Sequence, residues 1–271
     1  MAKGPYGRGG FVHPQERMQR SRLSIGEPRT QACTQFYFLN MDVDFTGSQD
    51  EVVQTGTFVQ QFPMDIRSAW SQLTEALVQF TLNITGEFFS QFPVPGLGWW
   101  GNSDLIHPQL RWRRSLRLPE NAQLRGNLKN IGSESAANIV FFCQRPDITF
   151  DVKINESREF RLLLDLGLNG IAQEQAPVQT QQIEYDLLVW GMHSTTSTIN
   201  VLFRDTYMNI NWSEKKLPIG AYAGIQGQPE PIIWFPIPYY LPRNTTLRAE
   251  FDNDAEETGQ YIELICERKL S

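Results

Sequence analysis

The sequence is poor in the residues from which catalytic and metal sites are built. Its 271 residues include three histidines and three cysteines, and none of them stands at the short spacing of a metal-ligand motif. Nucleophile-elbow, P-loop and dinucleotide-binding motifs are also absent. The sequence therefore predicts no catalytic residue, no metal ligand and no cofactor, and we expect a protein that is not an enzyme.

The cysteines do not suggest a disulfide framework, because their number is odd. Cys143 and Cys266 end the apolar runs VFFC and ELIC, where a reduced, buried thiol is the simplest interpretation.

Carboxylates crowd at residues 252–257, which would suit a glycosidase pair or a calcium site. We favour a solvated turn between two strands for this segment.

Long hydrophobic runs are missing as well. No apolar stretch approaches the roughly 20 residues that a membrane-spanning helix needs, and the first residues contain no apolar segment typical of a secretory signal. The composition, 41% hydrophobic and 20% charged, is that of a folded globular protein. We therefore expect neither a membrane anchor nor export.

The charge is unevenly distributed. The net charge is −6, yet residues 1–32 hold six basic and two acidic side chains. This glycine-rich segment has no periodic apolar pattern, so we expect an extended basic N-terminal arm. The arm's candidates for contact with a neighbouring subunit are Arg8, Arg17, Arg20 and Arg22. Binding of nucleic acid by the arm is the alternative, which we favour less because no lysine cluster accompanies the arginines.

What the sequence does contain is a repeat. Residues 118–145 and 241–268 align without a gap at an offset of 123, and 10 of the 28 positions are identical. The identical pairs include Leu124/Leu247, Arg125/Arg248, Asn130/Asn253, Cys143/Cys266 and Arg145/Arg268. A match at this spacing approaches the size of a small domain. The sequence therefore predicts two copies of one module, at residues 33–146 and 147–271.

Each module has the pattern of an all-β domain. Apolar and polar residues alternate over residues 36–45, with Phe36 and Phe38 at the start of an otherwise polar face. Similar short runs follow, separated by Gly, Pro and Asn turns. This predicts two tandem, duplicated β-sandwich modules of jelly-roll type. We expect one short helix, over residues 68–76, from the helical spacing of its apolar residues. Trp70 and Trp190 are expected to be equivalent, as are Asp65 and Asp186.

One strand differs sharply between the copies. Residues 111–117 read RWRRSLR, whereas residues 234–240 read WFPIPYY. We interpret these as outward faces that diverged to meet partners. The interface candidates are Arg111, Arg113, Trp234, Tyr239 and Tyr240, together with Trp99 and Trp100 in a glycine-rich loop. Stacking of a sugar on the same tryptophans is the alternative.

The closing segment, FPIPYYLPRNTTLRAEFDN followed by YIELICER, resembles the C-terminal strands of small structural proteins of tailed-phage virions. The resemblance implies a non-enzymatic virion protein, assembled in the host cytoplasm, that stabilises the head, neck or collar. It implies a symmetric homo-oligomer in contact with capsid, portal or neck proteins. The matching positions, Pro242, Asn244, Leu247, Arg248 and Asn253, are expected to define the fold. A host-surface or carbohydrate-binding β-sandwich is the alternative function.

Overall fold

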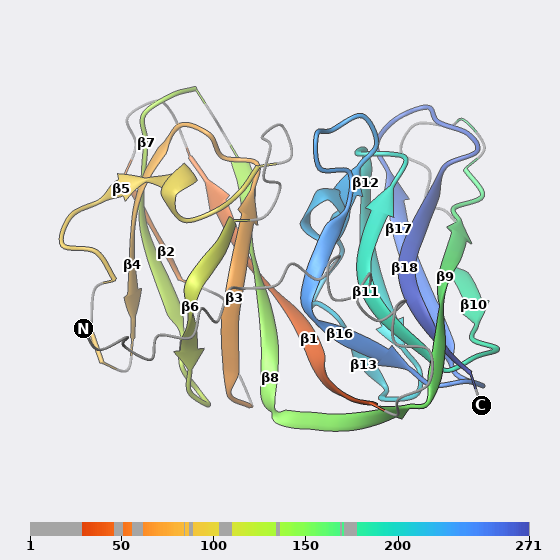
Figure 1. Ribbon diagram of the computed structural model, residues 1–271. Coiled ribbons are helices and arrows are strands. Elements are labelled where there is room, and N and C mark those ends of the chain that lie inside the picture. The colour runs from red at the N-terminus through yellow and green to blue at the C-terminus, as the bar shows by residue number, and fades with distance from the viewer. Residues whose placement is uncertain are drawn as a thin grey trace, which may run out of the picture.

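The protein is nearly all β. The structure is a computed structural model, and it describes residues 29–45, 51–55, 62–83, 85–86, 89–102, 110–133, 136–168, 170 and 178–270. These residues form sheets that are antiparallel except for the short pairing of β11 with β15, together with two short 3-10 helices, and no α-helix occurs among them. The strands stand roughly side by side in two groups, one for each half of the chain (Figure 1).

The first half is a sandwich of two four-stranded sheets. One sheet has the order β1-β8-β3-β6, with bounds Arg29–Asp44, Ala136–Ile154, Met64–Ser71 and Leu110–Leu118. The other has the order β2-β7-β4-β5, with bounds Glu51–Thr55, Leu124–Asn130, Ala76–Leu82 and Val94–Pro95. Helix η1 (Gly96–Gly98) follows β5. Leu39 of β1, Phe80 of β4 and Phe141 of β8 are buried in the core between the sheets.

The second half is built in the same way. In one sheet β9, β18 and β11 lie in that order, and both β16 and β15 pair with β11. The bounds are Glu156–Asp165, Tyr261–Leu270, Leu187–Ser194, Ile233–Leu241 and Gly224–Ile225. In the other sheet β10, β17 and β12 lie in order, and β13 and β14 pair with β12. Its bounds are Gln179–Gln182, Thr246–Asn253, Ile199–Asp205, Ile210–Asn211 and Leu217–Pro218, and η2 (Ile219–Ala221) follows β14.

The strand register of the first half recurs 123 residues later. Met64 pairs with Leu118, and Leu187 pairs with Leu241. The same shift relates the β3–β8 ladder to the β11–β18 ladder, including a register irregularity at the same place. It also relates β4–β7 to β12–β17, and β1–β8 to β9–β18. The two halves therefore share strand order and pairing, and only the pairing of β10 with β17 is shifted, by two residues, relative to that of β2 with β7.

Two of the identical residues have a visible local reason. Asn121 and Asn244 both have positive φ, 61° and 64°, a conformation that asparagine tolerates better than most residues. The guanidinium of Arg145 lies 3.7 Å from the centre of the Phe62 ring, and that of Arg268 lies 3.4 Å from the centre of the Tyr185 ring. Such cation–π contacts hold the last strand of each half against the segment before its third strand.

The helix expected over residues 68–76 is absent, and that prediction was wrong. β3 continues to Ser71, and β4 begins at Ala76. Leu73 is buried in the intervening turn, where its main-chain N–H donates to Ser71 Oγ at 3.1 Å. A buried leucine in a turn between two strands therefore produced the helical spacing.

The expected equivalences within β3 and β11 were also wrong. The ladders show that residue 188 is the equivalent of Asp65 and that residue 193 is the equivalent of Trp70. Asp186 and Trp190 are therefore two and three residues out of register. The match of two single residue types did not reveal the register, because the register is set by the pattern of apolar side chains along the whole strand and by the turns.

The expected boundaries fall inside strands. Arg29–Ala32, assigned to the arm, belong to β1, and the boundary between 146 and 147 lies within β8. β1 and β8 are long because they continue beyond their sandwich as a two-stranded ribbon, with Arg29 paired to Ile154. Cys33 and Val152 of this ribbon pack on Trp190 of the second half. The ribbon thus covers part of the outer face of β11 and β18.

A buried carboxylate fastens this ribbon. Glu267 of β18 accepts hydrogen bonds from Arg29, Ser157 and Trp190, the last at 3.1 Å. A buried carboxylate needs such donors to offset its loss of hydration. The N-terminal end of β1 is therefore held to the second half by a charge-assisted hydrogen-bond network.

Candidate interaction surface

The two halves are joined by an aromatic seam. Five buried side chains on the outer face of β1, β3 and β8 belong to the same apolar cluster as the core of the second half: Phe36, Phe38, Trp70, Val140 and Phe142. The Phe38 ring lies 4.4 Å from that of Tyr222, and the Phe36 ring 4.7 Å from that of Phe235. One continuous apolar core therefore crosses from one half to the other.

Backbone and charge contacts reinforce the seam. The main-chain N–H of Phe38 donates to the carbonyl oxygen of Trp212 at 2.6 Å, and Phe38 forms a parallel bridge with Ser213. Lys215 Nζ lies 2.5 Å from Asp42 Oδ1. The segment around residues 212–222 thus docks on the outer face and free edge of β1.

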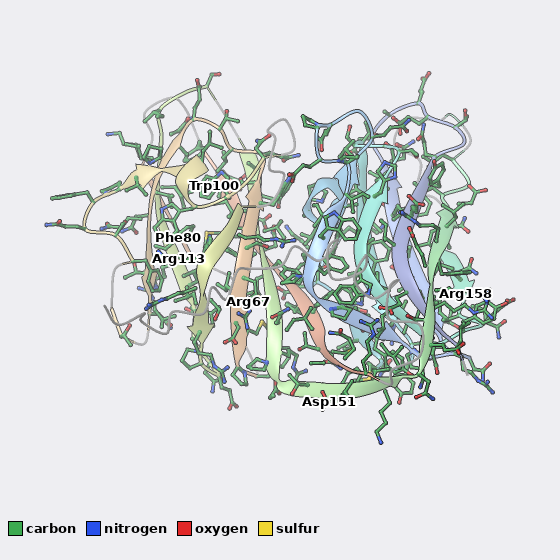
Figure 2. The ribbon with its side chains drawn as sticks, in the orientation of Figure 1. Arg67, Phe80, Trp100, Arg113, Asp151 and Arg158 are labelled. Carbon is green, nitrogen blue, oxygen red and sulfur yellow. The ribbon has the colours of Figure 1, made fainter. Side chains whose placement is uncertain are left out.

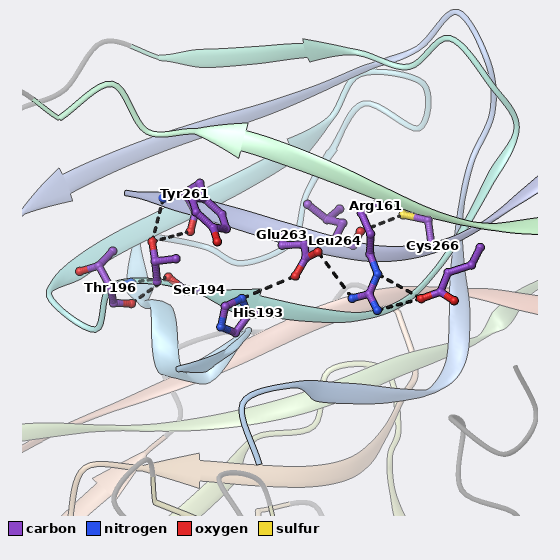
Figure 3. Close-up of polar contacts among 10 residues, drawn as sticks. Arg161, His193, Ser194, Thr196, Tyr261, Glu263, Leu264 and Cys266 are labelled. Carbon is purple, nitrogen blue, oxygen red and sulfur yellow. Dashed lines mark hydrogen bonds and ion pairs between the residues drawn. The ribbon is translucent and has the colours of Figure 1, made fainter. Parts of the chain in front are cut away.

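The equivalent outer face in the second half is charged. A shift of 123 converts the five seam residues into Glu159, Arg161, His193, Glu263 and Ile265. Arg161 lies 2.8 Å from Glu159 and 3.6 Å from Glu263, and His193 Nδ1 lies 3.6 Å from Glu263 (Figure 3). Burial lowers the pKa of His193, while Glu263 opposes that shift. We call this set, with the neighbouring Leu163, the β9 face.

The β9 face is open to solvent over much of its area. Arg161 is exposed, and Leu163 between it and Asp165 is 54% exposed. β9 is the last strand of its sheet, and within the described ranges no strand pairs with its outer edge. Only Ile265 of this set is covered, by the β1–β8 ribbon.

The docking segment of the second half, residues 212–222, has an equivalent in the first half that the described residues leave uncovered. Residues 89–99 correspond to residues 212–222, and we call them the docking loop. Phe92 is 68% exposed and Leu97 37% exposed. Trp99 is partly buried, with its ring 5.4 Å from that of Phe80 and 5.8 Å from that of Trp112. Each half therefore contains a docking segment and a receiving face, and the contacts among the described residues use only one of each.

Trp100, one of the interface candidates, does not belong to an exposed surface. Its side chain is 1% exposed, packs near Phe80, and donates from Nε1 to the Leu73 carbonyl oxygen at 2.9 Å (Figure 2). A Cβ at position 96 would lie 2.1 Å from the Trp100 ring, so Gly96 is what lets this ring turn inward. Trp99, in contrast, keeps part of its surface exposed.

The divergent strands β6 and β16 lie partly within the molecule. Tyr239 is buried, and its hydroxyl donates to Asp205 Oδ2 at 2.7 Å. Trp234 and Tyr240 are partly buried against the β1–β8 ribbon. Of these two tyrosines, the structure therefore leaves only Tyr240 partly accessible.

The two arginine candidates differ in environment. Arg111 is partly buried and donates to the main-chain carbonyl oxygen of Trp234. Burial lowers the pKa of its guanidinium. Arg113 is exposed in the stretch where β6 departs from the ladder with β3 (Figure 2). The arm candidates Arg8, Arg17, Arg20 and Arg22 lie outside the described residues.

The seam residues were missed by the sequence analysis. Phe36 and Phe38 stand on the polar face of their strand, and the residues 123 positions later are Glu159 and Arg161. The available signal was that Phe36 and Phe38 stand on an otherwise polar face and that charged residues occupy the corresponding positions of the second half. That contrast marks a face covered in one half and open in the other.

A cavity of about 230 Å³ opens at the top of the seam. It is lined by Trp70, Gln72, Asn102, Ser197, Pro218, Gly220 and Ile225. Neither its lining nor the rest of the described chain contains a cluster of three or more His, Cys, Asp or Glu side chains arranged to hold a metal ion. The described residues also contain no helix of the length and apolarity that a membrane crossing requires.

Comparison with known proteins gives little. No protein-family model matches the chain, and no curated protein matches it. Among solved structures, a β-porphyranase of glycoside hydrolase family 86 from the human gut bacterium Bacteroides plebeius aligns with a TM-score of 0.20 and 9% identity. The alignment covers 85% of this chain and 36% of that one. A similarity of this size indicates neither family nor activity.

Proposed function

We propose that this protein is a non-enzymatic structural subunit of a virion that assembles with its own copies into a symmetric oligomer. The observation that carries the proposal is the recurrence of one strand order and register in both halves. An ancestral sandwich that was duplicated in tandem accounts for this recurrence and for the sequence repeat.

The strand order supports a capsid role. Counting the eight main strands of a half in chain order, a 1-8-3-6 sheet faces a 2-7-4-5 sheet, which is the connectivity of a jelly roll. Jelly rolls form viral capsid proteins, and they also form lectins. The placement in a tailed-phage head, neck or collar, expected from the closing segment, stays a prediction.

The distribution of surfaces favours assembly over sugar binding. Trp100, one of the two stacking candidates, is buried. The docking loop and the β9 face are instead the equivalents, by the shift of 123 residues, of the two surfaces that already meet within the chain. A protein with one such contact satisfied and its counterparts open is suited to join further copies.

The mass of the full chain in solution tests this proposal. Sedimentation velocity over a hundredfold range of concentration, with negative-stain images, is expected to show an oligomer of defined size. A single chain at every concentration would contradict the proposal. If that single chain also bound an immobilised glycan saturably, and Trp99→Ala abolished the binding, the carbohydrate-binding alternative would replace it.

The arm offers an independent test. In the proposed assembly residues 1–28 lie on a neighbouring subunit, so a protease should cleave them only in the dissociated chain. Limited proteolysis followed by mass spectrometry, on assembled and on diluted protein, measures this. Equal cleavage rates in both states would speak against an inter-subunit arm.

A further inference from the structure

We infer that the docking loop of one chain binds the β9 face of a second copy, so that the contact between the halves is repeated between chains. The inference deepens the proposed function and rests on it. It names the two surfaces through which copies meet, and it follows from the shift of 123 residues that superposes the ladders of the two halves.

The positions of the two surfaces suit a head-to-tail contact. The docking loop, with β5 and η1, lies at one end of the molecule, and β9 lies at the other (Figure 1). One chain therefore cannot satisfy both surfaces by itself. A heterologous contact of this kind closes into a ring or continues as a filament, according to the rotation between copies.

The loop carries donors that have no partner within the described chain. Trp99 Nε1 and Ser90 Oγ are both buried and unpaired. At the equivalent positions of the second half, Ser213 Oγ and the Tyr222 hydroxyl are 2.7 Å apart and hydrogen-bonded. Buried polar groups are normally paired. The first half therefore lacks the internal hydrogen bond that closes the docking segment of the second half.

One pair of residues that the shift brings together has complementary chemistry. Tyr222 packs on Phe38 within the chain, and the shift of 123 turns this pair into Trp99 of one copy and Arg161 of the other. A guanidinium on a tryptophan ring is a favourable cation–π contact. The Lys215–Asp42 ion pair becomes Phe92 against Asp165, so at this position the contact loses its charge complementarity and the ring contributes apolar contact area alone. Tryptophan and arginine are also common anchors of protein interfaces.

The two versions of the contact differ in strength. Within the chain, five apolar side chains are buried, as in a permanent interface. Between chains, the receiving face is a charged network of Arg161, Glu159, Glu263 and His193. Such an interface is more hydrated and is weakened by salt. The protein thus joins its halves permanently and its copies reversibly.

Point variants on each surface test the inference. Phe92→Asp removes the exposed ring and places a negative charge against Asp165, and Arg161→Glu removes the cation. Each is expected to weaken association at least tenfold in sedimentation equilibrium. The matched controls are Tyr207→Asp, an aromatic side chain 61% exposed outside both surfaces, and Arg125→Glu, at an exposed position of β7. Both controls should associate like the unmodified chain.

Two refinements make the readout specific. Phe92→Lys loses the same ring but gains a charge that suits Asp165, so it should associate more tightly than Phe92→Asp. If Arg161→Glu lowers the melting temperature, Leu163→Asp, on the same face and 54% exposed, replaces it. Equal association of the Phe92→Lys and Phe92→Asp variants would overturn the assigned neighbour of Phe92.

Mixing the two defective variants decides the head-to-tail geometry. The Phe92→Asp chain keeps an intact β9 face, and the Arg161→Glu chain keeps an intact docking loop. An equimolar mixture should form a complex of two chains and nothing larger. No complex, or wild-type assembly by either variant alone, would overturn the inference while leaving self-assembly in place. A wild-type chain that never associates contradicts the proposed function itself.

Discussion

The guanidinium of Arg111 donates a hydrogen bond to the main-chain carbonyl oxygen of Trp234, the residue that occupies its own position in the other half. A side chain of β6 thus reaches the backbone of β16, the strand that occupies its position in the other half. The difference between RWRRSLR and WFPIPYY therefore serves in part to join the halves. It is not only a difference between two outward surfaces.

Reversal of charge should separate the two arginine candidates. Arg111→Glu places a carboxylate beside a carbonyl oxygen in a partly buried site, so we expect a loss of about 3 kcal/mol in the free energy of unfolding. Arg113→Glu, on the exposed stretch of β6, should change it by less than about 0.5 kcal/mol. Urea unfolding of both variants measures the difference. If Arg111→Glu changed the free energy of unfolding as little as Arg113→Glu does, Arg111 would not support the seam.

The two asparagines with positive φ should respond alike. Glycine adopts this conformation without strain and a β-branched residue does not. We expect Asn121→Val and Asn244→Val each to cost about 1–2 kcal/mol, and the glycine variants to be nearly neutral. Glu120→Val in the same turn is the control, because Glu120 is not among the positive-φ residues. Thermal unfolding reports the effect, and a costly glycine variant would refute the backbone explanation.

Leu124 and Leu247 should be equally important for stability. Both are almost fully buried, each in the core of its own sandwich. Truncation to alanine leaves a cavity and should cost about 2–5 kcal/mol at either site. Leu163→Ala, on an exposed leucine, should cost far less. Denaturant titration that found only one of the pair sensitive would argue against equivalent cores.

Asp205 should make stability depend on pH. Burial raises the pKa of its carboxyl, opposed by hydrogen bonds from the Tyr239 hydroxyl and the Tyr207 main-chain N–H. The folded state then holds the proton to higher pH than the unfolded state does. The stabilising contribution is full below the unfolded pKa and is lost as pH rises through the raised folded pKa.

Asp205→Asn removes this titration and keeps the shape of the side chain. Relative to the variant, the unmodified protein should become more stable as pH falls from neutrality towards the ordinary pKa of an aspartate. Urea unfolding of both proteins at several pH values provides the comparison. A constant difference across that range would mean that Asp205 titrates alike in the folded and unfolded states.

The fold was largely accessible to sequence reasoning, whereas the interaction surface was not. Alternation over residues 36–45 predicts a strand, because it is a local signal. The identity of Leu247 with Leu124 predicts a repeated module, because it needs only an alignment of the sequence with itself. The β-sandwich architecture is confirmed. The sequence did not reveal that Trp100 is buried, since its inward orientation depends on Gly96 and on a carbonyl group of a distant turn.

By itself, the sequence determined which face of each strand is apolar and that one pattern returns after 123 residues. Only the tertiary structure decided that the face bearing Phe36 and Phe38 is covered by the second half, while the one bearing Glu159 and Arg161 remains open. The reason is physical. Strand periodicity arises from neighbouring residues, but the burial of an outer face depends on segments far away in the chain.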